Sequence, residues 1–448
     1  MEVVGFVDEG LGHSSYLVDL GDGRALVVDP PRLPLAHLDE ARARGLEIVW
    51  TADSHSHADY VSGSPELAAR GAQFVASSGA GLEVAHRGLD DGDEIVLRDG
   101  LVLRAIATPG HTPDHLAYLL LEKHQPVALF SGGSLMVGAV GRTDLLGPEP
   151  REELTRRMFR SLRDRVLTLP DDVAVYPTHG AGSFCSAPGA TDRTTTIGRE
   201  RATNPLLQIG DEDAFVDALL AGLGSFPAYF SRLPEVNRRG PRLYGALPKL
   251  PTLDLDAFQA HMATGAVVVD ARPIRHFGSA YIPGALSIEL RPVFASWLGW
   301  LTDARRPLLF VLDDDQDPSE LVRQCLAVGH ENLVGALAGG MRTWRDSDLP
   351  VASIPLVGPD AVTGTLLDVR QQNEFVDSHV PGANNVELGA LADATIADGA
   401  VTVMCGHGER AMTGASVLAA RAHTDLRVLA GGPTEWAATT GGSLVCDA

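Results

Sequence analysis

The stretch Thr51-Ala-Asp-Ser-His-Ser-His-Ala-Asp-Tyr60 decides the fold of the first half of the chain. It follows the β-rich run Leu46–Trp50, which predicts a polar loop at the end of a strand. His55, His57 and Asp59 occupy alternate positions, and alternate side chains of an extended segment point to the same side. The spacing can therefore direct three polar side chains into one cavity.

Two further histidine turns follow along the chain. His111 lies in the tight Pro-Gly turn of Thr108–His115, and His179 lies in Tyr176-Pro-Thr-His-Gly180. Histidine is the commonest metal ligand, and three clusters in this order, each next to a turn, predict descent from a metal-binding protein. The first 200 or so residues alternate short β-rich runs with helical patterns, which is typical of layered α/β structure with mixed sheets.

This order resembles the metallo-β-lactamase superfamily, and most closely its persulfide dioxygenase and glyoxalase II branches. The resemblance covers residues 1–205 and implies an αββα sandwich. The residues that match the family motif position by position are His55, His57, Asp59, His111 and His179.

Two other segments, Gly141–Asp144 and Gly182–Cys185, also look like persulfide dioxygenase sequence. They make Arg142 and Cys185 candidate substrate-binding residues. Arg142 is either a structural turn arginine or a contact for an anionic substrate. Cys185 is either a sulfur relay near the metal pocket or an ordinary packed thiol.

The chain departs from the family motif at two positions. Tyr60 stands where the family has the last histidine of the first motif, and Gly133 stands where it has an aspartate. Without these two ligands a two-metal hydrolase is not expected. His55, His57 and His111 remain as a set of three imidazoles for one metal ion, iron or zinc, and Asp59 is a further candidate ligand.

The C-terminal half contains an internal repeat. Val267-Val-Val-Asp-Ala-Arg272 resembles Thr365-Leu-Leu-Asp-Val-Arg370, and Tyr281-Ile-Pro-Gly-Ala285 resembles His379-Val-Pro-Gly-Ala383, with a constant offset of 98 residues (270 to 368, for example). Each copy reads strand, turn and helix repeatedly, which predicts a parallel sheet covered by helices. We therefore expect a connector over 206–251 and two related domains over 252–352 and 353–448.

The second copy contains the loop Cys405-Gly-His-Gly-Glu-Arg410 between a strand pattern and a helical run. Backbone N–H groups of such a loop, together with the positive end of the following helix, favour a thiolate. Gly406 and Gly408 allow the tight curl at a substrate-binding loop. Arg410 can hold an anionic sulfur acceptor or brace the loop.

This loop and the paired Asp-x-Arg and Pro-Gly-Ala signatures resemble the rhodanese family over 252–448. The resemblance implies that Cys405 carries a persulfide sulfur between donor and acceptor. In the first copy an offset of 92 residues, from Gly339 to Gly431, places Asp313 opposite Cys405 and Pro318 opposite Arg410. We therefore expect the first copy to be non-catalytic.

Composition limits the partners of the 448-residue chain. A formal charge of −22 disfavours nucleic acid and anionic membranes. The N-terminal segment lacks the basic start and the apolar run of a signal peptide, and four cysteines suit a reducing compartment, so we expect a cytoplasmic protein. A homo-oligomer is compatible with the sequence.

The sequence predicts an enzyme that oxidises or transfers the sulfane sulfur of low-molecular-weight persulfides, with sulfite as a partner. Three alternatives stay open. The first is a sulfurtransferase with an inactive N-terminal domain. The others are a mononuclear zinc thioester hydrolase and a non-enzymatic persulfide carrier.

Overall fold

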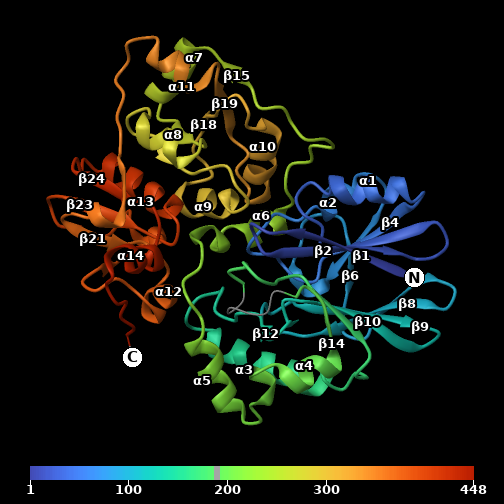
Figure 1. Ribbon diagram of the computed structural model, residues 1–448. Coiled ribbons are helices and arrows are strands. Elements are labelled where there is room, and N and C mark those ends of the chain that lie inside the picture. Colours follow the sequence, from blue (N-terminus) through green and yellow to red (C-terminus); the bar gives the residue numbers. More distant parts are fainter. Residues whose placement is uncertain (186–191, 448) are drawn as a thin grey trace. The chain divides into compact units, whose positions relative to one another are not determined.

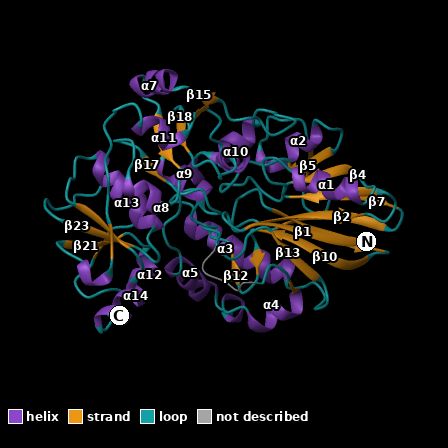
Figure 2. Ribbon diagram, turned by 45° about the horizontal axis from the view of Figure 1, so that its top comes forward, coloured by secondary structure: helices purple, strands orange, loops and turns teal. Residues whose placement is uncertain are grey.

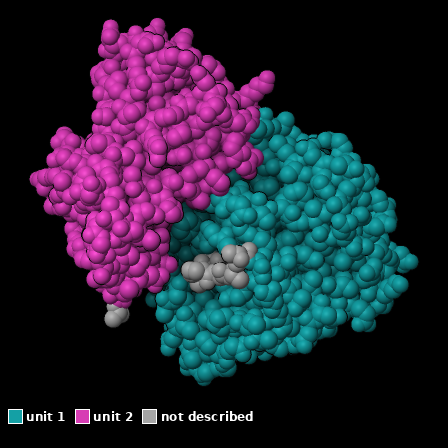
Figure 3. Space-filling view, viewed as in Figure 1, with its two compact units in different colours: residues 1–247, 326–329 teal, residues 248–325, 330–448 magenta. Residues whose placement is uncertain are grey.

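The computed structural model describes residues 1–185 and 192–447, which form two compact units (Figures 1 and 3). Unit 1 comprises Met1–Leu247 and Leu326–Gly329, and unit 2 comprises Pro248–Cys325 and His330–Ala448. Among the described residues, no helix combines the length and the apolar character needed to cross a membrane.

Unit 1 contains two six-stranded sheets. The first has the order β1-β2-β3-β4-β5-β6, antiparallel from β1 to β3 and parallel from β3 to β6. The second has the order β14-β13-β10-β9-β8-β7. The strands of the first sheet are β1 Glu2–Asp8, β2 His13–Asp19, β3 Arg24–Val28, β4 Glu47–Ala52, β5 Gln73–Ser77 and β6 Arg87–Leu89. Those of the second are β7 Glu94–Arg98, β8 Leu101–Ala107, β9 Leu116–Glu122, β10 Gln125–Gly132, β13 Ala174–Pro177 and β14 Thr195–Thr196.

Side-chain parity explains the layers of unit 1. In β9, Tyr118 and Leu120 pack between the sheets, whereas Leu119 and Leu121 pack on the helical side. Both faces of this strand are therefore apolar and buried, as a strand between two layers requires. The result is the predicted αββα sandwich, in which helices cover the outer face of each sheet (Figure 2).

The helices of unit 1 and one small hairpin complete the sandwich. Residues of α1 and α2 join the apolar cluster outside the first sheet, and residues of α3, α4 and α5 join the cluster outside the second. Residues 206–247, expected as part of a connector, lie within unit 1 and form α5 and α6. The bounds are α1 Leu35–Ala43, α2 Ser64–Ala68, β11 Leu135–Met136, β12 Ala139–Val140, α3 Arg151–Ser161, α4 Ile197–Thr203, α5 Glu212–Ala221 and α6 Leu233–Arg239.

Unit 2 contains two parallel sheets of five strands, ordered β15-β19-β18-β16-β17 and β20-β24-β23-β21-β22. The identical order confirms two copies of one α/β fold. The strands are β15 Thr252–Leu253, β16 Val267–Asp270, β17 Leu286–Ser287, β18 Leu308–Val311, β19 Leu333–Leu337, β20 Leu356–Val357, β21 Thr365–Asp368, β22 Asn384–Asn385, β23 Val401–Met404 and β24 Leu426–Leu429. The helices are α7 Leu255–Ala263, α8 Ile274–Ser279, α9 Phe294–Leu301, α10 Pro318–Ala327, α11 Gly340–Arg345, α12 Gln372–Asp377, α13 Glu409–Ala420 and α14 Pro433–Thr440.

The Asp-x-Arg signature of each copy is a structural clip. Arg370 donates to the Asp368 carboxylate and to the Ser378 carbonyl, which ties the end of β21 to the end of α12. Arg272 and Asp270 repeat the arrangement in the first copy. Because these charges are buried, they persist only as hydrogen-bonded pairs.

Candidate functional sites

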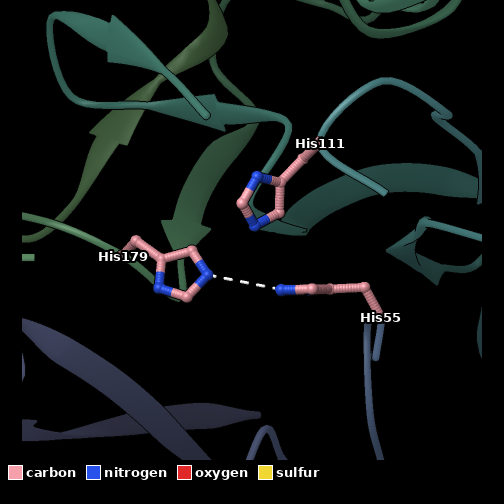
Figure 4. Close-up of side chains that lie close together, drawn as sticks. All are labelled: His55, His111 and His179. Carbon is pink, nitrogen blue, oxygen red and sulfur yellow. Dashed lines mark hydrogen bonds between the residues drawn. The ribbon is translucent and has the colours of Figure 1, made fainter. Parts of the chain in front are cut away.

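Three histidines converge in unit 1. His55 follows β4, His111 lies in the turn between β8 and β9, and His179 follows β13. One ring nitrogen of each lies within 4.8 Å of the corresponding atoms of the other two (Figure 4). All three side chains are at most 4% exposed.

The hydrogen bonds of His55 and His111 fix which nitrogen faces the centre. Ser54 Oγ donates to the Asp29 carboxylate at 2.8 Å, so it accepts from His55 Nδ1, also at 2.8 Å. His111 Nδ1 donates to the Arg142 carbonyl at 2.7 Å. We assign both protons from these acceptors, which leaves an unprotonated Nε2 on each ring.

The third ring completes the same arrangement. His179 Nδ1 lies 3.3 Å from Asp59 Oδ2, so its Nε2 also faces the centre, only 3.3 Å from Nε2 of His55. Burial lowers the pKa of His111 to about 3, and that of His55 well below its usual value, so neither ring gains a proton near neutrality. The Nε2 atoms of His179 and His55 lie within hydrogen-bonding distance of each other (Figure 4), and a cation bound between the rings would satisfy all three facing nitrogens. The three rings therefore fit a metal ion, with their Nδ1 atoms held as metal-ligating histidines usually are.

His57, expected as the third ligand, has its Nε2 engaged by other groups, whereas its buried Nδ1 has no hydrogen-bond partner among the described residues. Its Nε2 lies 3.2 Å from Asp29 Oδ1 and 3.0 Å from the Tyr60 hydroxyl. Burial acts to lower the pKa of His57, but the charge and hydrogen bond of Asp29, together with the charges of Asp53 and Asp59, outweigh burial and raise that pKa. A ligand atom of His57 also lies within 4.8 Å of atoms of Asp59 and His179, which makes a second candidate group that shares His179 with the first.

Asp29 is a residue that the sequence analysis missed. It directly follows β3 at a positive φ of 50° and accepts hydrogen bonds from the Ser54 amide, the Ser54 hydroxyl and the Thr178 hydroxyl. This fully buried carboxylate therefore joins β3 to the segments that carry His55 and His179. Its only sequence signal is its place in Val27-Val-Asp-Pro30 at the end of a strand.

Arg142 and Cys185 lie close to this centre, where the Arg142 guanidinium is occupied by other contacts and the Cys185 thiol is buried. Arg142 pairs with Asp144 through two hydrogen bonds and donates to the carbonyls of Phe184 and Gly224. Burial raises the pKa of the Cys185 thiol well above its usual range, and the charge of Asp59 adds to the effect. A protonated thiol is a poor nucleophile.

Cys405 lies at the carboxyl end of β23, the central strand of its sheet. Its Sγ accepts a hydrogen bond from the Gly408 amide at 3.1 Å and is almost fully buried. Gly408 has a φ of 115°, which favours glycine, and precedes the first residue of the twelve-residue helix α13. The loop thus directs backbone N–H groups and a helix N-terminus at the sulfur.

Arg410 braces this loop from the first turn of α13. Its guanidinium donates to both carboxylate oxygens of Glu374 in α12, at 2.6 and 2.8 Å. Burial opposes ionisation of Glu374, but Arg410 lowers the pKa of that carboxyl. The bidentate pair fixes the guanidinium beside the loop, where it contributes positive charge.

Comparisons with known proteins match both units. The family model "Rhodanese-like domain" matches residues 254–347 and 357–439. A probable metallo-hydrolase of Burkholderia pseudomallei is 30% identical over 286 residues, covering 54% of this chain and 94% of that protein. The chain belongs to the metallo-β-lactamase-fold family and carries two rhodanese-like domains.

Two further relatives agree with this assignment. The human mitochondrial persulfide dioxygenase ETHE1 is 29% identical over 204 residues, which cover 44% of this chain and 73% of that protein. A solved metallo-β-lactamase structure from Staphylococcus aureus subsp. aureus COL is 26% identical with a TM-score of 0.66, and covers 75% of this chain and 98% of its own. The metallo-β-lactamase fold and the rhodanese repeat predicted from the sequence are thus confirmed.

Gly133, one of the two departures from the metallo-β-lactamase motif, makes room for His111. A Cβ atom at position 133 would lie 2.2 Å from His111 Cδ2, far inside any normal contact. On its Nδ1 side the ring lies close to Gly141, where a Cβ would lie 2.9 Å from Nδ1. The space that the Cβ of the family's aspartate would need is therefore taken by the His111 ring.

The first rhodanese-like copy has lost the thiol loop in space as well as in sequence. Asp313 follows β18, where Cys405 follows β23, and its carboxylate lies 2.6 Å from Nδ1 of His276 in α8. Gln316 donates to the Ala271 carbonyl and accepts from the Asp313 amide, which closes this loop. The position therefore offers a carboxylate instead of a sulfur nucleophile.

Proposed function

We propose that the chain is an enzyme of sulfane-sulfur metabolism with two centres. Cys405 accepts the outer sulfur of a low-molecular-weight thiol persulfide and passes it to sulfite. A mononuclear metal centre in unit 1 oxidises such a persulfide. The observation that carries the proposal is the Cys405 sulfur beneath the Gly408 amide at the start of α13, with Arg410 beside it.

The transfer at Cys405 takes two balanced displacement steps. The Cys405 thiolate attacks the outer sulfur of the persulfide, a new S–S bond forms, and the old one breaks to release the donor thiol, which keeps the proton. Sulfite then attacks the outer sulfur of the Cys405 persulfide through its own lone pair. Thiosulfate leaves, and the Cys405 thiolate is regenerated. The Gly408 amide and Arg410 hold the negative charge during both steps.

The oxidation is proposed for His55, His111 and His179, which would hold one metal ion through Nε2. The similarity to persulfide dioxygenase ETHE1 favours iron. Bound iron would supply oxygen chemistry and open coordination positions for the substrate. Persulfide, dioxygen and water then give thiol, sulfite and two protons, and the sulfite is the acceptor that Cys405 needs.

A second candidate function follows from the same three imidazoles. Three neutral histidines also suit catalytic zinc, which activates water for hydrolysis. In that case the substrate of unit 1 is a thioester. The metal content of the purified protein and the two assays distinguish the candidates. Iron with oxygen uptake on glutathione persulfide supports oxidation, and zinc with thioester cleavage supports hydrolysis.

The transfer is tested by mixing the protein with glutathione persulfide and sulfite and measuring thiosulfate. Cys405→Ser is expected to abolish thiosulfate formation, because serine cannot form a persulfide. Cys446→Ser replaces an exposed cysteine and serves as the matched control. Undiminished transfer by Cys405→Ser refutes the assignment.

The ligand set is tested by comparing His179→Ala with His57→Ala. The first variant is expected to lose the metal, because it removes a ligand. The second is expected to retain most of the metal, since His57 Nε2 is engaged by Asp29 and Tyr60. Metal content by elemental analysis and oxygen uptake are the readouts. The opposite ranking contradicts the proposed set.

A further inference from the structure

We propose that Asn237 is a positioning residue of the metal centre, an inference that rests on the proposed metal function of unit 1. Asn237 lies in α6 and is 7% exposed. Its Nδ2 donates to the carbonyls of His57 at 2.9 Å and Tyr60 at 3.0 Å. Its Oδ1 accepts from the Ser62 amide at 2.9 Å.

These three hydrogen bonds, which we call the Asn237 clamp, hold an irregular loop in place. Residues 53–63 between β4 and α2 contain no strand or helix, so their backbone groups lack the partners that regular structure provides. The side chains of His57, Tyr60 and Ser62 are almost fully buried. The Asn237 side chain donates to two carbonyls through its NH2 group and accepts from one amide through its oxygen. A carboxylate or a hydroxyl cannot provide the same two donors and one acceptor.

The clamp acts on the metal centre through Asp59. This residue lies between the two clamped carbonyls of His57 and Tyr60, so the path of the backbone at Asp59 is fixed from both sides. Its carboxylate lies 3.3 Å from His179 Nδ1 and orients the ring whose Nε2 faces His55. Partners that orient a ligating histidine typically change metal affinity when they are disturbed.

The position of Asn237 in the sequence bears on where the metal-binding domain ends. The residue lies beyond the metal motifs, in a segment that the sequence suggests is a connector. We therefore assign residues up to Leu247 to the metal-binding domain. A packing role alone would not require an amide, because it would tolerate an apolar side chain of similar size.

The test uses cobalt(II), whose visible spectrum reports the geometry of its ligands. The full-length wild-type protein is titrated with cobalt(II) beside Asn237→Asp and Asn237→Ser, and thermal unfolding is recorded for each. Asn237→Asp keeps the acceptor for Ser62 but turns lone pairs towards the two carbonyls. We expect its cobalt affinity to fall on the order of 10- to 100-fold, with an altered spectrum.

Asn237→Ser retains one hydroxyl donor, so we expect an intermediate loss, and it carries the test if Asn237→Asp does not fold. The matched control is Asn385→Asp in unit 2, because Asn385 Nδ2 also donates to two backbone carbonyls, those of Asp368 and Arg370, both at 3.0 Å. We expect this control to bind cobalt as the wild type does.

Two outcomes overturn the inference and can be told apart. If the wild type binds cobalt in a way that His179→Ala abolishes, the metal centre stands, and wild-type affinity and spectrum in folded Asn237→Asp or Asn237→Ser refute the clamp. If the wild type binds no cobalt that depends on His179, the proposed metal centre fails and the clamp fails with it. Sulfur transfer by Cys405, measured in the same preparations, tests the other centre separately.

Discussion

Replacing Gly133 by aspartate is expected to damage the proposed metal centre, although it restores a residue of the family motif. The backbone at position 133 is not in the left-handed region, so the substitution meets only a steric obstacle. The new Cβ would lie 2.2 Å from His111 Cδ2 and 2.8 Å from Cγ and Nε2 of the same ring. The ring must therefore retreat by roughly 1.3 Å or more to reach a normal carbon contact.

The expected loss of stability follows from the contacts that hold the His111 ring in place. A retreat strains the 2.7 Å bond from His111 Nδ1 to the Arg142 carbonyl, which contributes about 1 kcal/mol. Overpacking of a well-filled site costs about 1–3 kcal/mol in addition. We therefore expect Gly133→Asp to lower the free energy of unfolding of unit 1 by about 2–4 kcal/mol, or Tm by roughly 4–16 °C. We also expect metal affinity to fall at least about 100-fold, because a ligand is displaced.

The assay combines thermal unfolding with metal titration on the purified variant. Gly210→Asp is the matched control, since a Cβ at Gly210 meets no atom within 4 Å and the glycine has no positive φ. We expect this control to behave as the wild type. A Gly133→Asp protein that binds metal as tightly as the wild type and unfolds at the same temperature would refute the placement of His111.

Three further predictions concern separate parts of the chain. Arg410→Lys is expected to lower kcat/KM for thiosulfate formation about 10-fold or more, because lysine cannot replace the bidentate contact with Glu374. Asp59→Asn is expected to weaken metal binding about 10-fold by removing the charge beside His179, as a metal titration would show. Burial lowers the pKa of His37 to about 3, so its neutral form contributes stability that is fully present above pH 6.5 and is lost towards pH 3, by about 1.4 kcal/mol per pH unit. Denaturant unfolding of the wild type and His37→Gln between pH 4 and 7 (roughly the window set by these pKa values) should give a smaller slope for the variant, and equal slopes would contradict this.

Local sequence patterns predicted most of the fold, because strands and helices each impose a characteristic spacing of apolar residues. The repeat at an offset of 98 residues predicted two parallel sheets, and the structure gives both the same strand order. The loop from Cys405 to Arg410 likewise lies where a strand–loop–helix pattern predicts it. These features depend on neighbours within a few residues, so the sequence carries them directly.

Local patterns could not predict the proposed ligand set, because the directions of its histidine rings depend on residues far away in the sequence. Alternation placed His55 and His57 on one side, but that rule holds for a regular strand, and these residues lie in an irregular loop. The direction of the His57 ring depends on Asp29, which precedes it by 28 positions. Asn237 follows His57 by 180 positions, and no local pattern connects the two residues.

The two departures from the family motif act together in the structure. Gly133 removes a carboxylate and in doing so leaves space for the His111 ring. Tyr60 removes an imidazole, and its hydroxyl lies 3.0 Å from His57 Nε2, which is thereby engaged outside the group of His55. What remains is a set of three rings whose outer nitrogens all face acceptors. The loss of two motif ligands, taken position by position, suggests a site that no longer binds metal. The contacts made by Tyr60 and the space left by Gly133 instead favour a site for a single ion.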